Sequence, residues 1–552
     1  MRPSVKKKKE RGYSFRLRAG LVMFGLAAAA GLILVRAFDL QVLQAARLSD
    51  LAIQEYCQTI TLLPSRGVIY DRHLVELAVS VQVESIYARP GLIAHKNSSA
   101  AKLARVLKMN KGKVLQSLNK KAPFVWIKRQ VEPDLAAQVA ALELDGVGVF
   151  PEGRRYYPHK ELAAHLLGFA GLDARGLEGL EKGYDKLLRG PVTRLTRMRD
   201  GLGRPIYDEG LDAAEIPTGH ELVLTIDKRI QYLTERALTR AVTKYRAKGG
   251  MVVVLNPDTG EVYAAALLPT FNPNVYNRYE PYLRRNRSVT DTFEPGSAFK
   301  IFTLAAALEE GLVSPATEID CENGAWPVGG RVIHDVHPYG RLTVSQVLIR
   351  SSNIGAAKLG LALGAKRLHA HISRFGFGAP TGLDLPGESG GLLRPPGRWQ
   401  TIDTASASFG QGVNVTAWQL ASAVGAVANE GLLMRPFVVR EIRQADHRLI
   451  KRIGPLSRGQ AVSARTAHRL IRMMEKVTAE GGTGTRARVP GYRVAGKTGT
   501  AQKFDRAAGT YSQKDFYAIF VGLAPVIEPA IVIVVIIDEP RGSIYGGVVA
   551  AP

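Results

Sequence analysis

The hydrophobic pattern of this 552-residue chain begins with an unbroken uncharged run near the N-terminus, at residues 19–35. In a helix this run rises about 26 Å, which is close to the hydrocarbon thickness of a bilayer. Arg36 and Asp39 end the run, and the arginine side chain can reach the membrane interface. The pattern therefore predicts one transmembrane anchor at residues 19–38.

Basic residues dominate the segment before the anchor, because residues 1–18 hold eight lysines and arginines against one acid, Glu10. Positive segments stay on the cytoplasmic side, so we expect a cytoplasmic basic tail with the rest of the chain outside. A cleaved signal peptide is the alternative, but the run is longer than the usual apolar core and lacks a small-residue cleavage site. The expected location is the cytoplasmic (inner) membrane, crossed once, with the main domains in the periplasm or its extracytoplasmic equivalent.

Residues 39–215 have a mixed pattern, with short strand-like pieces at residues 68–70 and 85–88 and a helical repeat at residues 132–142. The stretch at residues 208–220 is acidic and aperiodic and contains proline and glycine, which is typical of a linker. We expect residues 39–215 to form a mixed α/β domain.

A different pattern fills residues 216–552. Residues 251–265 have the alternation of a β-hairpin around a turn at residues 256–260, and residues 297–474 are rich in helical periodicity. Strands at both ends of a helical middle predict one α+β domain, with an antiparallel sheet flanked by helices and assembled from both ends of the region. The other predicted elements are a helix at residues 231–242 and strands at residues 222–226, 492–500, 517–523 and 531–537.

Composition changes this picture in two respects. The formal net charge of +25 suits nucleic acid, an anionic membrane or an anionic polymer, but an outside location and the lack of a recognition motif argue against nucleic acid. We expect the positive surface to face anionic lipid headgroups and peptidoglycan precursor. Cys57 and Cys321 lie in different predicted domains, which favours free thiols over a disulfide. No Cys/His cluster has metal-ligand spacing, so neither a metal nor a cofactor is expected.

The first candidates for chemistry are a serine and a lysine three residues apart, Ser297 and Lys300. Pro295 and Gly296 interrupt the chain before them, and residues 297–310 have the pattern of an apolar helix. A serine that opens this helix directs its backbone N–H toward a developing oxyanion, and the lysine lies one turn away on the same face. Apolar neighbours would desolvate the lysine and lower its pKa, so that it could take the proton of the serine.

The same spacing occurs at Ser4, Ser99 and Ser117, so the match at Ser297 carries little weight alone. A helix-capping serine is the ordinary explanation of an isolated match. Two further elements downstream, in order, give the match at Ser297 its weight. They are Ser351-Ser352-Asn353, after a predicted helix at residues 344–350, and Lys497-Thr498-Gly499-Thr500, on a predicted strand.

Chemistry suggests a role for each of these residues. Ser351 can relay a proton to a leaving nitrogen, and Lys497 keeps the local field positive. The Thr500 N–H can complete an oxyanion hole with the N–H of Ser297, and Gly499 lets a substrate backbone approach the strand edge. The catalytic candidates are thus Ser297, Lys300, Ser351 and Lys497. The binding candidates are Asn353, for a substrate amide, Thr498 and Thr500, for a substrate carboxylate, and Gly499.

These three elements in this order resemble the signature of penicillin-interacting enzymes. Over nearly everything after residue 40, the chain is similar to class B penicillin-binding proteins, specifically to division-type FtsI peptidoglycan D,D-transpeptidases. Further matching segments are residues 66–72, 155–158, 164–168, 176–181, 224–227, 409–412 with Thr416, and 481–484.

The resemblance implies a dimerisation-like pedestal domain for residues 39–215 and a serine β-lactamase-like fold for residues 216–552. It implies cross-linking of peptidoglycan stem peptides during septal wall synthesis, through an acyl-serine formed as D-Ala departs, and it implies β-lactams as ligands that mimic the donor. An FtsW-type glycosyltransferase and other division proteins are the partners that it implies.

Three features depart from the family or refine the comparison. Where the first motif usually continues with Asn-Gly, this chain has His73-Leu74, which puts a turn there in doubt. The family continues into a further helix beyond Pro552, so C-terminal segments in addition to this sequence stay possible. The Ser-Ser-Asn form of the second element favours the division type, because elongation-type relatives tend toward Ser-x-Asp.

Other functions are weighed against this one. A class A β-lactamase needs a glutamate-activated water, and no Glu-x-x-x-Asn occurs between residues 353 and 497. A β-lactam sensor usually needs several membrane spans. An elongation-type class B transpeptidase and a scaffold of the wall-synthesis complex stay open as alternatives.

Overall fold

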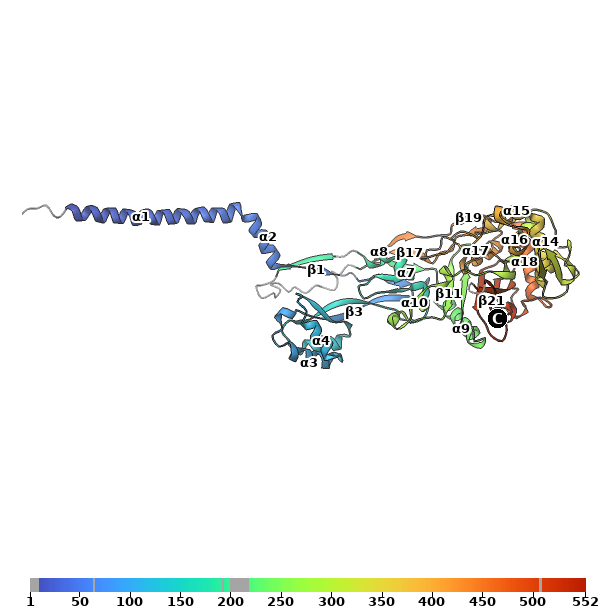
Figure 1. Cartoon of the computed structure of the whole chain (residues 1–552), viewed down its shortest axis with the longest axis horizontal. Helices are drawn as coiled ribbons and strands as arrows, with labels where there is room; N and C mark the ends of the chain where they lie inside the picture. The colour runs from blue at the N-terminus through green and yellow to red at the C-terminus, as the bar shows by residue number, and fades with distance from the viewer. Residues whose placement is uncertain (1–8, 63–64, 191–192, 199–217, 506–508) are drawn as a thin grey trace, which may run out of the picture. The chain divides into compact units, whose positions relative to one another are not determined.

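The computed structural model divides the chain into two compact units (Figure 1). Unit 1 comprises Met1–Leu62 and Val192–Pro217, and unit 2 comprises Leu63–Pro191 and Thr218–Pro552. Residues 1–8 of the predicted tail and residues 208–217 of the predicted linker lie outside the described residues. The residues that the structure describes are 9–62, 65–190, 193–198, 218–505 and 509–552.

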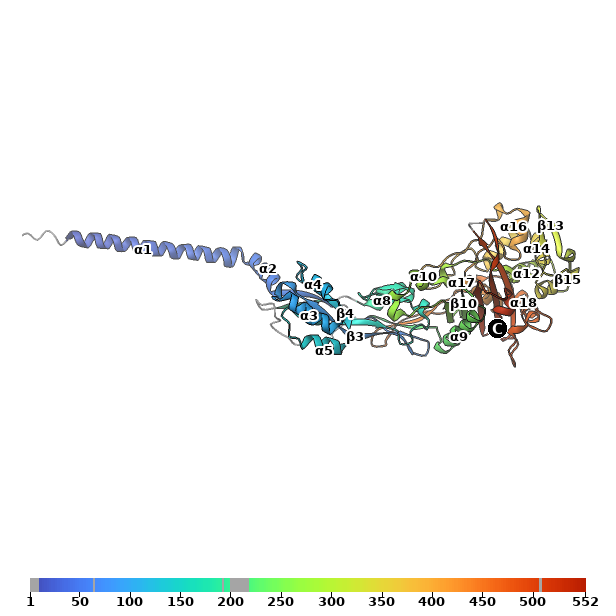
Figure 2. The same ribbon diagram turned by 60° about the horizontal axis from the view of Figure 1, so that its bottom comes forward.

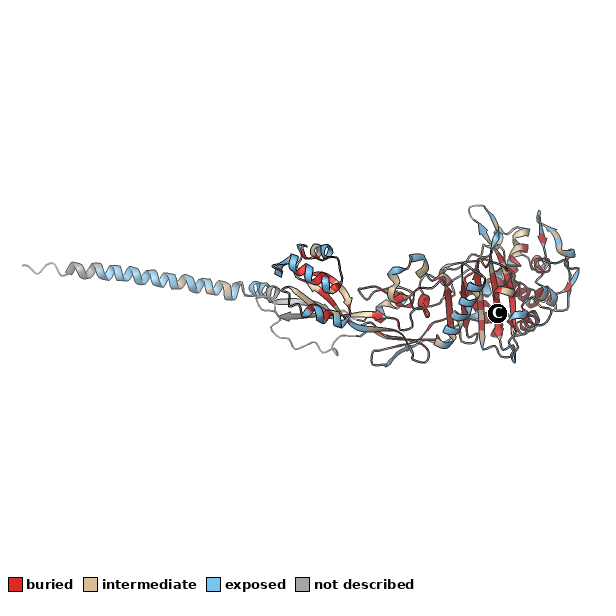
Figure 3. Cartoon of the chain, turned by 90° about the horizontal axis from the view of Figure 1, so that it is seen from below, coloured by how far each residue is buried: buried red, intermediate tan, exposed pale blue. Residues whose placement is uncertain are grey.

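Unit 1 is built on the long helix α1 (Lys9–Phe38), which continues through a π-helical turn (Asp39–Leu43) into α2 (Ala45–Tyr56). The segment Phe15–Leu43 is long and apolar enough to cross a membrane, and none of its most apolar stretch is buried against protein (Figure 3). Apolar side chains exposed along a whole helix are typical of a membrane anchor. An antiparallel pair of strands, β1 (Cys57–Leu62) and β8 (Thr193–Met198), completes the unit.

Unit 2 begins with a pedestal that is organised around the long strand β3 (Glu76–Ala88), which pairs antiparallel with β5 (Val147–Tyr156) along most of its length. At the far end of β3 a separate small core forms under three helices. We call residues 85–147 the pedestal head. Its elements are α3 (Lys96–Leu107), α4 (Lys111–Leu118), β4 (Val125–Val131) and α5 (Pro133–Ala140).

One predicted strand lies in an unexpected sheet. The strand predicted at residues 222–226 forms as β9 (Glu221–Leu224), but it pairs in parallel with β2 (Ile69–Tyr70) of the pedestal. On its other side it pairs with β17 (Val439–Arg443), so segments far apart in sequence share a seven-stranded sheet. All four residues of β9 are buried, and the two neighbouring strands provide hydrogen-bond partners for the backbone groups along both of its edges.

The turn that the His73-Leu74 sequence put in doubt is present. Leu74 has φ of +63°, in the left-handed region that usually holds glycine or asparagine, and its N–H donates to the carbonyl oxygen of Asp71 at 3.1 Å. The Asp71 carboxylate accepts from the N–H groups of His73 and Val75 at 2.7 and 2.9 Å. This aspartate-centred turn holds the chain without the usual Asn-Gly.

A five-stranded antiparallel sheet lies at the centre of the part of unit 2 that follows residue 218 (Figures 1 and 2). Its strand order is β11-β10-β22-β21-β20. The first two strands come from the start of the region and the other three from its end, which confirms the predicted α+β fold. The strands are β10 (Gly249–Leu255), β11 (Val262–Leu268), β20 (Ala495–Asp505), β21 (Thr510–Ala524) and β22 (Ile531–Asp538).

Alternate residues of β10 bury opposite faces of this sheet. Met251 and Val253 belong to the large core of the helical middle, whereas Val252 and Val254 face a smaller cluster with Leu238 of α9. The helices of the large core include α12 (Lys300–Glu309), α17 (Ala417–Ala428) and α18 (Ala464–Thr478), and those of the smaller cluster are α9 (Lys228–Lys244) and α19 (Gly546–Val549). Cys321 is a free buried thiol, and the side chain of Cys57 lies outside the described part of the chain.

Candidate active site

The candidate nucleophile Ser297 lies in a tight 3₁₀ turn (Gly296–Phe299) that packs against β20. The predicted helix therefore begins as α-helix only at Lys300. Gly296 has φ of +51°, and a Cβ atom there would meet the carbonyl oxygen of Thr500 at 2.8 Å. Glycine is thus required both by the left-handed backbone and by the close approach of the turn to the strand.

Lys300 joins the first two sequence elements. Its side chain is fully buried, and its Nζ donates to Ser297 Oγ at 3.0 Å and to Asn353 Oδ1 at 2.7 Å. It also contacts Ser351 twice, at the carbonyl oxygen at 2.5 Å and at Oγ at 3.2 Å. The ammonium is therefore surrounded by oxygen acceptors and has no carboxylate among these partners.

Lys497 brings the third element to the same place. It is fully buried in β20, and its Nζ donates to Ser351 Oγ at 2.9 Å and to the carbonyl oxygen of Thr498 at 2.9 Å. Ser351 caps α13 (Val344–Arg350) with a left-handed φ of +63°. Its hydroxyl consequently lies within hydrogen-bond distance of both lysines.

Burial of two neighbouring ammonium groups sets the electrostatics of the site. Desolvation by burial lowers the pKa of Lys300 well below its ordinary value, the charge of Lys497 lowers it further, and the charge of Asp335 opposes both effects. Desolvation by burial also lowers the pKa of Lys497 to about 7. Two buried like charges disfavour double protonation, so one lysine can be a base while the other keeps a proton.

The binding candidates on β20 are held by their own neighbours. The Thr498 hydroxyl is buried and lies 3.0 Å from Thr483 Oγ1, and Thr500 Oγ1 accepts from the N–H of Gly546 at 3.3 Å. A Cβ at Gly499 would lie 3.0 Å from the carbonyl oxygen of Pro295. Packing of the turn that carries Ser297 therefore favours a glycine here, and the approach of a substrate backbone stays a prediction.

The amide of Asn353 has partners on both of its polar atoms. Its Oδ1 accepts from Lys300, and its Nδ2 donates to the carbonyl oxygen of His334 at 2.8 Å. A substrate amide would have to share or replace one of these contacts, so the predicted role of Asn353 in substrate orientation stays a prediction.

Two acidic residues of the site were not identified from the sequence. Asp335 bonds to the middle of the Ser351-Ser352-Asn353 element. Glu294, three residues before the nucleophile, accepts from Gly412 N at 2.8 Å and from Tyr511 Oη at 3.0 Å, and burial raises its pKa. Glu294 stands next to the Ser-x-x-Lys match and could have been found there, whereas nothing in the local pattern marks Asp335.

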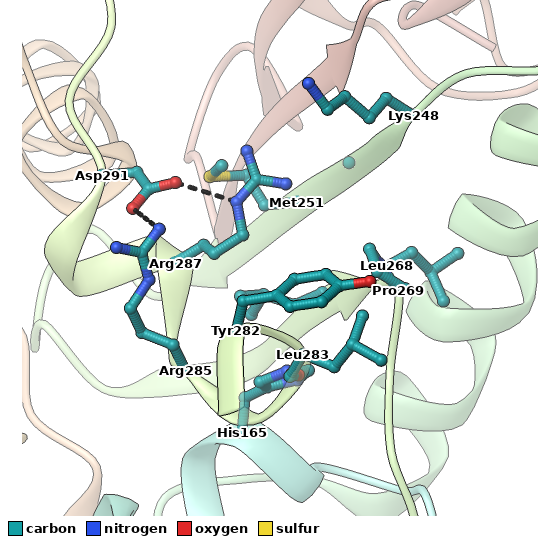
Figure 4. Close-up of a pocket in the computed structure, with 12 residues that line it drawn as sticks. His165, Lys248, Met251, Leu268, Pro269, Tyr282, Leu283, Arg285, Arg287 and Asp291 are labelled. Carbon is teal, nitrogen blue, oxygen red and sulfur yellow. Dashed lines mark hydrogen bonds and ion pairs between the residues drawn. The ribbon is translucent and has the colours of Figure 1, made fainter. Parts of the chain in front are cut away.

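A cavity of about 270 Å³ lies away from this cluster, and none of the predicted site residues lines it (Figure 4). Among the residues that line it, His165 donates from Nε2 to the carbonyl oxygen of Leu283 at 2.9 Å, and burial lowers the pKa of the imidazole to about 4. Arg285 and Arg287 at its edge both pair with Asp291, at 2.8 Å each. Among the described residues, no group of three or more His, Cys, Asp and Glu side chains could hold a metal ion.

Fold and serine–lysine cluster together define a serine acyltransferase of the penicillin-binding type. Residues 250–552 match the model of the penicillin-binding protein transpeptidase domain, and residues 61–224 match that of the penicillin-binding protein dimerisation domain. The chain thus belongs to the penicillin-binding protein family, among the class B peptidoglycan D,D-transpeptidases.

Individual relatives agree with this membership. The peptidoglycan D,D-transpeptidase FtsI of Escherichia coli (strain K12) is 38% identical over 88% of this chain and 82% of its own length. Stage V sporulation protein D of Bacillus subtilis (strain 168) is 37% identical over 92% and 79%. The crystal structure of penicillin-binding protein 3 from Mycobacterium tuberculosis with aztreonam matches with a TM-score of 0.68 at 28% identity, covering 87% of this chain and 91% of that one.

Proposed function

We propose that Ser297 is the nucleophile of the transpeptidase and that Lys300 is its general base. One observation above all supports this: Lys300 Nζ lies 3.0 Å from Ser297 Oγ in a buried site that lowers the pKa of the lysine. The unprotonated lysine takes the hydroxyl proton as Ser297 Oγ attacks the carbonyl carbon of the penultimate D-Ala of a donor stem.

The remaining candidates complete the reaction. The N–H groups of Ser297 and Thr500 stabilise the oxyanion, which the close packing of their two segments favours. The C–N bond then breaks, and Ser351, between the two lysines, passes a proton to the departing nitrogen of D-Ala. The amine of a neighbouring stem attacks the ester in the reverse sense and restores Ser297.

Substrate is held on β20. The hydroxyls of Thr498 and Thr500, beside the charge of Lys497, bind the donor carboxylate, and Asn353 orients the donor amide. Gly499 gives the substrate backbone room beside the strand. β-Lactams occupy the same positions, since they resemble the donor, and they acylate Ser297.

We assign this chemistry to septal wall synthesis during cell division, with an FtsW-type glycosyltransferase and other division proteins as partners. The Ser-Ser-Asn element and the 38% identity to FtsI support division. The identity to a sporulation protein is nearly as high, so depletion in the living cell is the appropriate test. Filamentation with blocked septa is expected, and rounding without filamentation would instead indicate the elongation type.

The topology follows from the anchor. Residues 1–18 form a cytoplasmic tail, residues 19–38 span the inner membrane, and the pedestal at residues 39–215 and the transpeptidase domain at residues 216–552 lie outside. A reporter fused after residue 45 is expected to be active only on the extracytoplasmic side, and cytoplasmic activity would reverse the orientation.

Labelled penicillin tests the nucleophile. The wild-type chain is expected to be labelled covalently and Ser297→Ala to lose all labelling, because no other residue supplies the attacking oxygen. The matched control is Ser99→Ala, which removes a serine of the same Ser-x-x-Lys spacing in the pedestal head and should keep full labelling. Labelling of Ser297→Ala would place the nucleophile elsewhere.

A further inference from the structure

The pedestal head carries an unusual distribution of charge. Residues 85–131 contain eleven lysines and arginines and no aspartate or glutamate, and the four acids of the head are confined to residues 132–147. Seven of the basic side chains are exposed, and none of the seven makes an ion pair with any described residue. They are Lys102, Arg105, Lys108, Lys111, Lys113, Lys120 and Lys121.

Aromatic side chains accompany these charges. Phe124 and Trp126, which follow the last two lysines at the start of β4, are 41% and 37% exposed. Their rings contact each other edge to face, at 4.8 Å between centroids. Partly exposed aromatic rings beside flexible lysines are typical of protein segments at a membrane interface.

The composition of this surface favours a lipid over a protein partner. Six of the seven exposed cations are lysines, and lysine is depleted in protein–protein interfaces whereas arginine is enriched. A diffuse array of lysines suits a fluid anionic surface, where each contributes by its charge rather than by directed hydrogen bonds. The anchor helix, by its proposed insertion, tethers the chain that carries the head to such a surface, which raises the effective concentration of lipid for the head.

We propose that this basic surface of the pedestal head binds the anionic phospholipid surface of the membrane that holds the anchor. The inference rests on the proposed anchoring and topology but not on the proposed catalytic roles. Binding of the head in this way would couple the orientation of the pedestal, and with it the transpeptidase domain, to the charge of the membrane.

Tryptophan quenching by brominated lipid tests the proposal on the full chain. The protein is reconstituted in vesicles of phosphatidylcholine, alone or mixed with phosphatidylglycerol, and the Trp126 contribution is taken as the difference between wild type and Trp126→Phe. Quenching of Trp126 is expected only in the vesicles that contain phosphatidylglycerol, and it should disappear at high salt. The joint change of Lys113, Lys120 and Lys121 to Glu should abolish it, since each cation lost lowers the bound-to-free ratio about fivefold.

The matched control reverses three exposed cations of α18, Arg465, Arg472 and Lys476, and should leave the quenching intact. Equal Trp126 quenching in both lipids, or none in either, would overturn the proposal, and the second result would favour an acidic protein as partner. Flotation with neutral vesicles tests the anchor separately, and penicillin labelling tests the active site separately.

A second, independent observation concerns Asp335, which follows β14 (Arg331–His334). Its carboxylate accepts three hydrogen bonds from the second sequence element and the start of α14 (Asn353–Leu363). Oδ2 accepts from Ser352 Oγ at 2.5 Å, and Oδ1 accepts from the N–H groups of Asn353 at 2.5 Å and of Ile354 at 3.1 Å. A carboxylate at the N-terminus of a helix of this length is also favoured by the helix dipole.

The residue before Asp335 fixes the side chain of the same element. The carbonyl oxygen of His334 accepts from Asn353 Nδ2, and this turns Oδ1 of Asn353 toward Lys300. The segment His334-Asp335 therefore holds both the backbone and the Asn353 side chain of the Ser351-Ser352-Asn353 element. We infer that Asp335 is a positioning residue that holds Ser351 and Asn353 against the ammonium of Lys300.

The acylation rate of Asp335→Asn tests this inference, with Asp320→Asn as the control, an exposed aspartate nearby that contacts none of these residues. Misplacement of the element should slow acylation by penicillin about 10²-fold. Asp335 raises the pKa of Lys300, whereas Lys497 lowers it, so the acidic limb of the rate profile should also move to lower pH. If Asp335 had a merely structural role, Asp335→Asn would have a lower melting temperature but an acidic limb of the rate profile at the wild-type pH. Wild-type rates with an unmoved limb would overturn the inference.

Discussion

Two clusters of fully buried charge stand in contrast within unit 2. In the pedestal, Glu181 is completely buried and accepts from Arg66 Nε at 2.5 Å and from Arg155 Nε at 2.6 Å. Arg66 also pairs with Asp185 at 2.6 Å. Despite the opposing desolvation, these arginines lower the pKa of Glu181, so the charges are stabilised by one another.

The active-site cluster has the opposite character. Lys300 and Lys497 are buried just as completely, but their hydrogen-bond partners are hydroxyl, carbonyl and amide oxygens. Their pKa values are lowered, which means that folding disfavours their charged forms. Burial alone does not distinguish a structural cluster from a reactive one, but the form that each pKa shift favours does. The shift of Glu181 favours the charged carboxylate, whereas the shifts of the two lysines favour the neutral amine, which keeps an unprotonated base available near neutral pH.

Replacement of Lys300 should give the largest effect. Lys300→Met removes the proposed base, so acylation by penicillin should slow about 10²- to 10⁴-fold, the usual contribution of general-base catalysis. Because methionine replaces a buried amine whose charged form is disfavoured by burial, the free energy of unfolding should stay equal or rise. Stopped-flow acylation and denaturant unfolding measure the two quantities. A Lys300→Met variant that is destabilised but fully active would mean that Lys300 belongs to a structural cluster and not to a reactive one.

Replacement of Glu181 should show the converse. Glu181→Gln leaves two buried guanidinium groups without their carboxylate, and removal of one partner of a buried pair costs about 3–5 kcal/mol. Since the pKa of Glu181 is lowered in the folded state, its contribution is present above the pKa of an unfolded glutamate and is lost as pH falls through the folded value. Denaturant unfolding at neutral and acidic pH should show the difference shrinking in acid.

The control for Glu181 is Glu178→Gln, three residues earlier and only partly buried, which has no ion pair among the described residues. It should change stability little. Acylation per folded molecule should stay at the wild-type rate in both variants. A slowed acylation in Glu181→Gln at full folding would show that the pedestal cluster acts on the active site.

The four catalytic candidates could be predicted from sequence because their order along the chain is itself informative. The structure links these four residues one to the next by hydrogen bonds, from Ser297 to Lys300, then to Ser351 and then to Lys497. Their catalytic roles stay a prediction. Asp335 could not be found in this way, because its contacts cross from a hairpin to a helix start and leave no period or spacing in the sequence.

The fold was predictable to a similar degree. The alternation of apolar residues predicted most strands of the central sheet, but the same alternation suits any sheet, so it could not place β9 beside β2. The turn at Leu74 was doubtful because local preference argues against a left-handed leucine. Hydrogen bonds to Asp71 outweigh that preference, and such compensation becomes visible only in three dimensions.

The pH dependence of acylation should distinguish the two lysines. Because the pKa of Lys497 is about 7, acylation should decline on the alkaline side as this lysine loses its proton, while the acidic limb reports protonation of Lys300. Lys497→Arg keeps the positive charge at all accessible pH values and should remove the alkaline limb. Rate profiles of correctly folded variants, checked by melting temperature, measure this, and an unchanged alkaline limb would assign it to another group.

Removal of one partner of a surface ion pair should give the smallest change in the free energy of unfolding among these variants. Arg452, 69% exposed, pairs at 3.1 Å with Glu441, which is nearly buried and also pairs with Arg443 at 2.6 Å. Because water screens the exposed partner and Arg443 keeps the carboxylate paired, Arg452→Ala should cost roughly 0–1 kcal/mol, less at high salt. Arg448→Ala is the control, since its guanidinium bonds the neutral side chain of Gln444 and its effect should not depend on salt. The loss of stability in Arg452→Ala could prove as large as that in Glu181→Gln. Burial of only one partner would then be enough to make an ion pair strongly stabilising, and the burial of both partners in the pedestal cluster would not explain its stability.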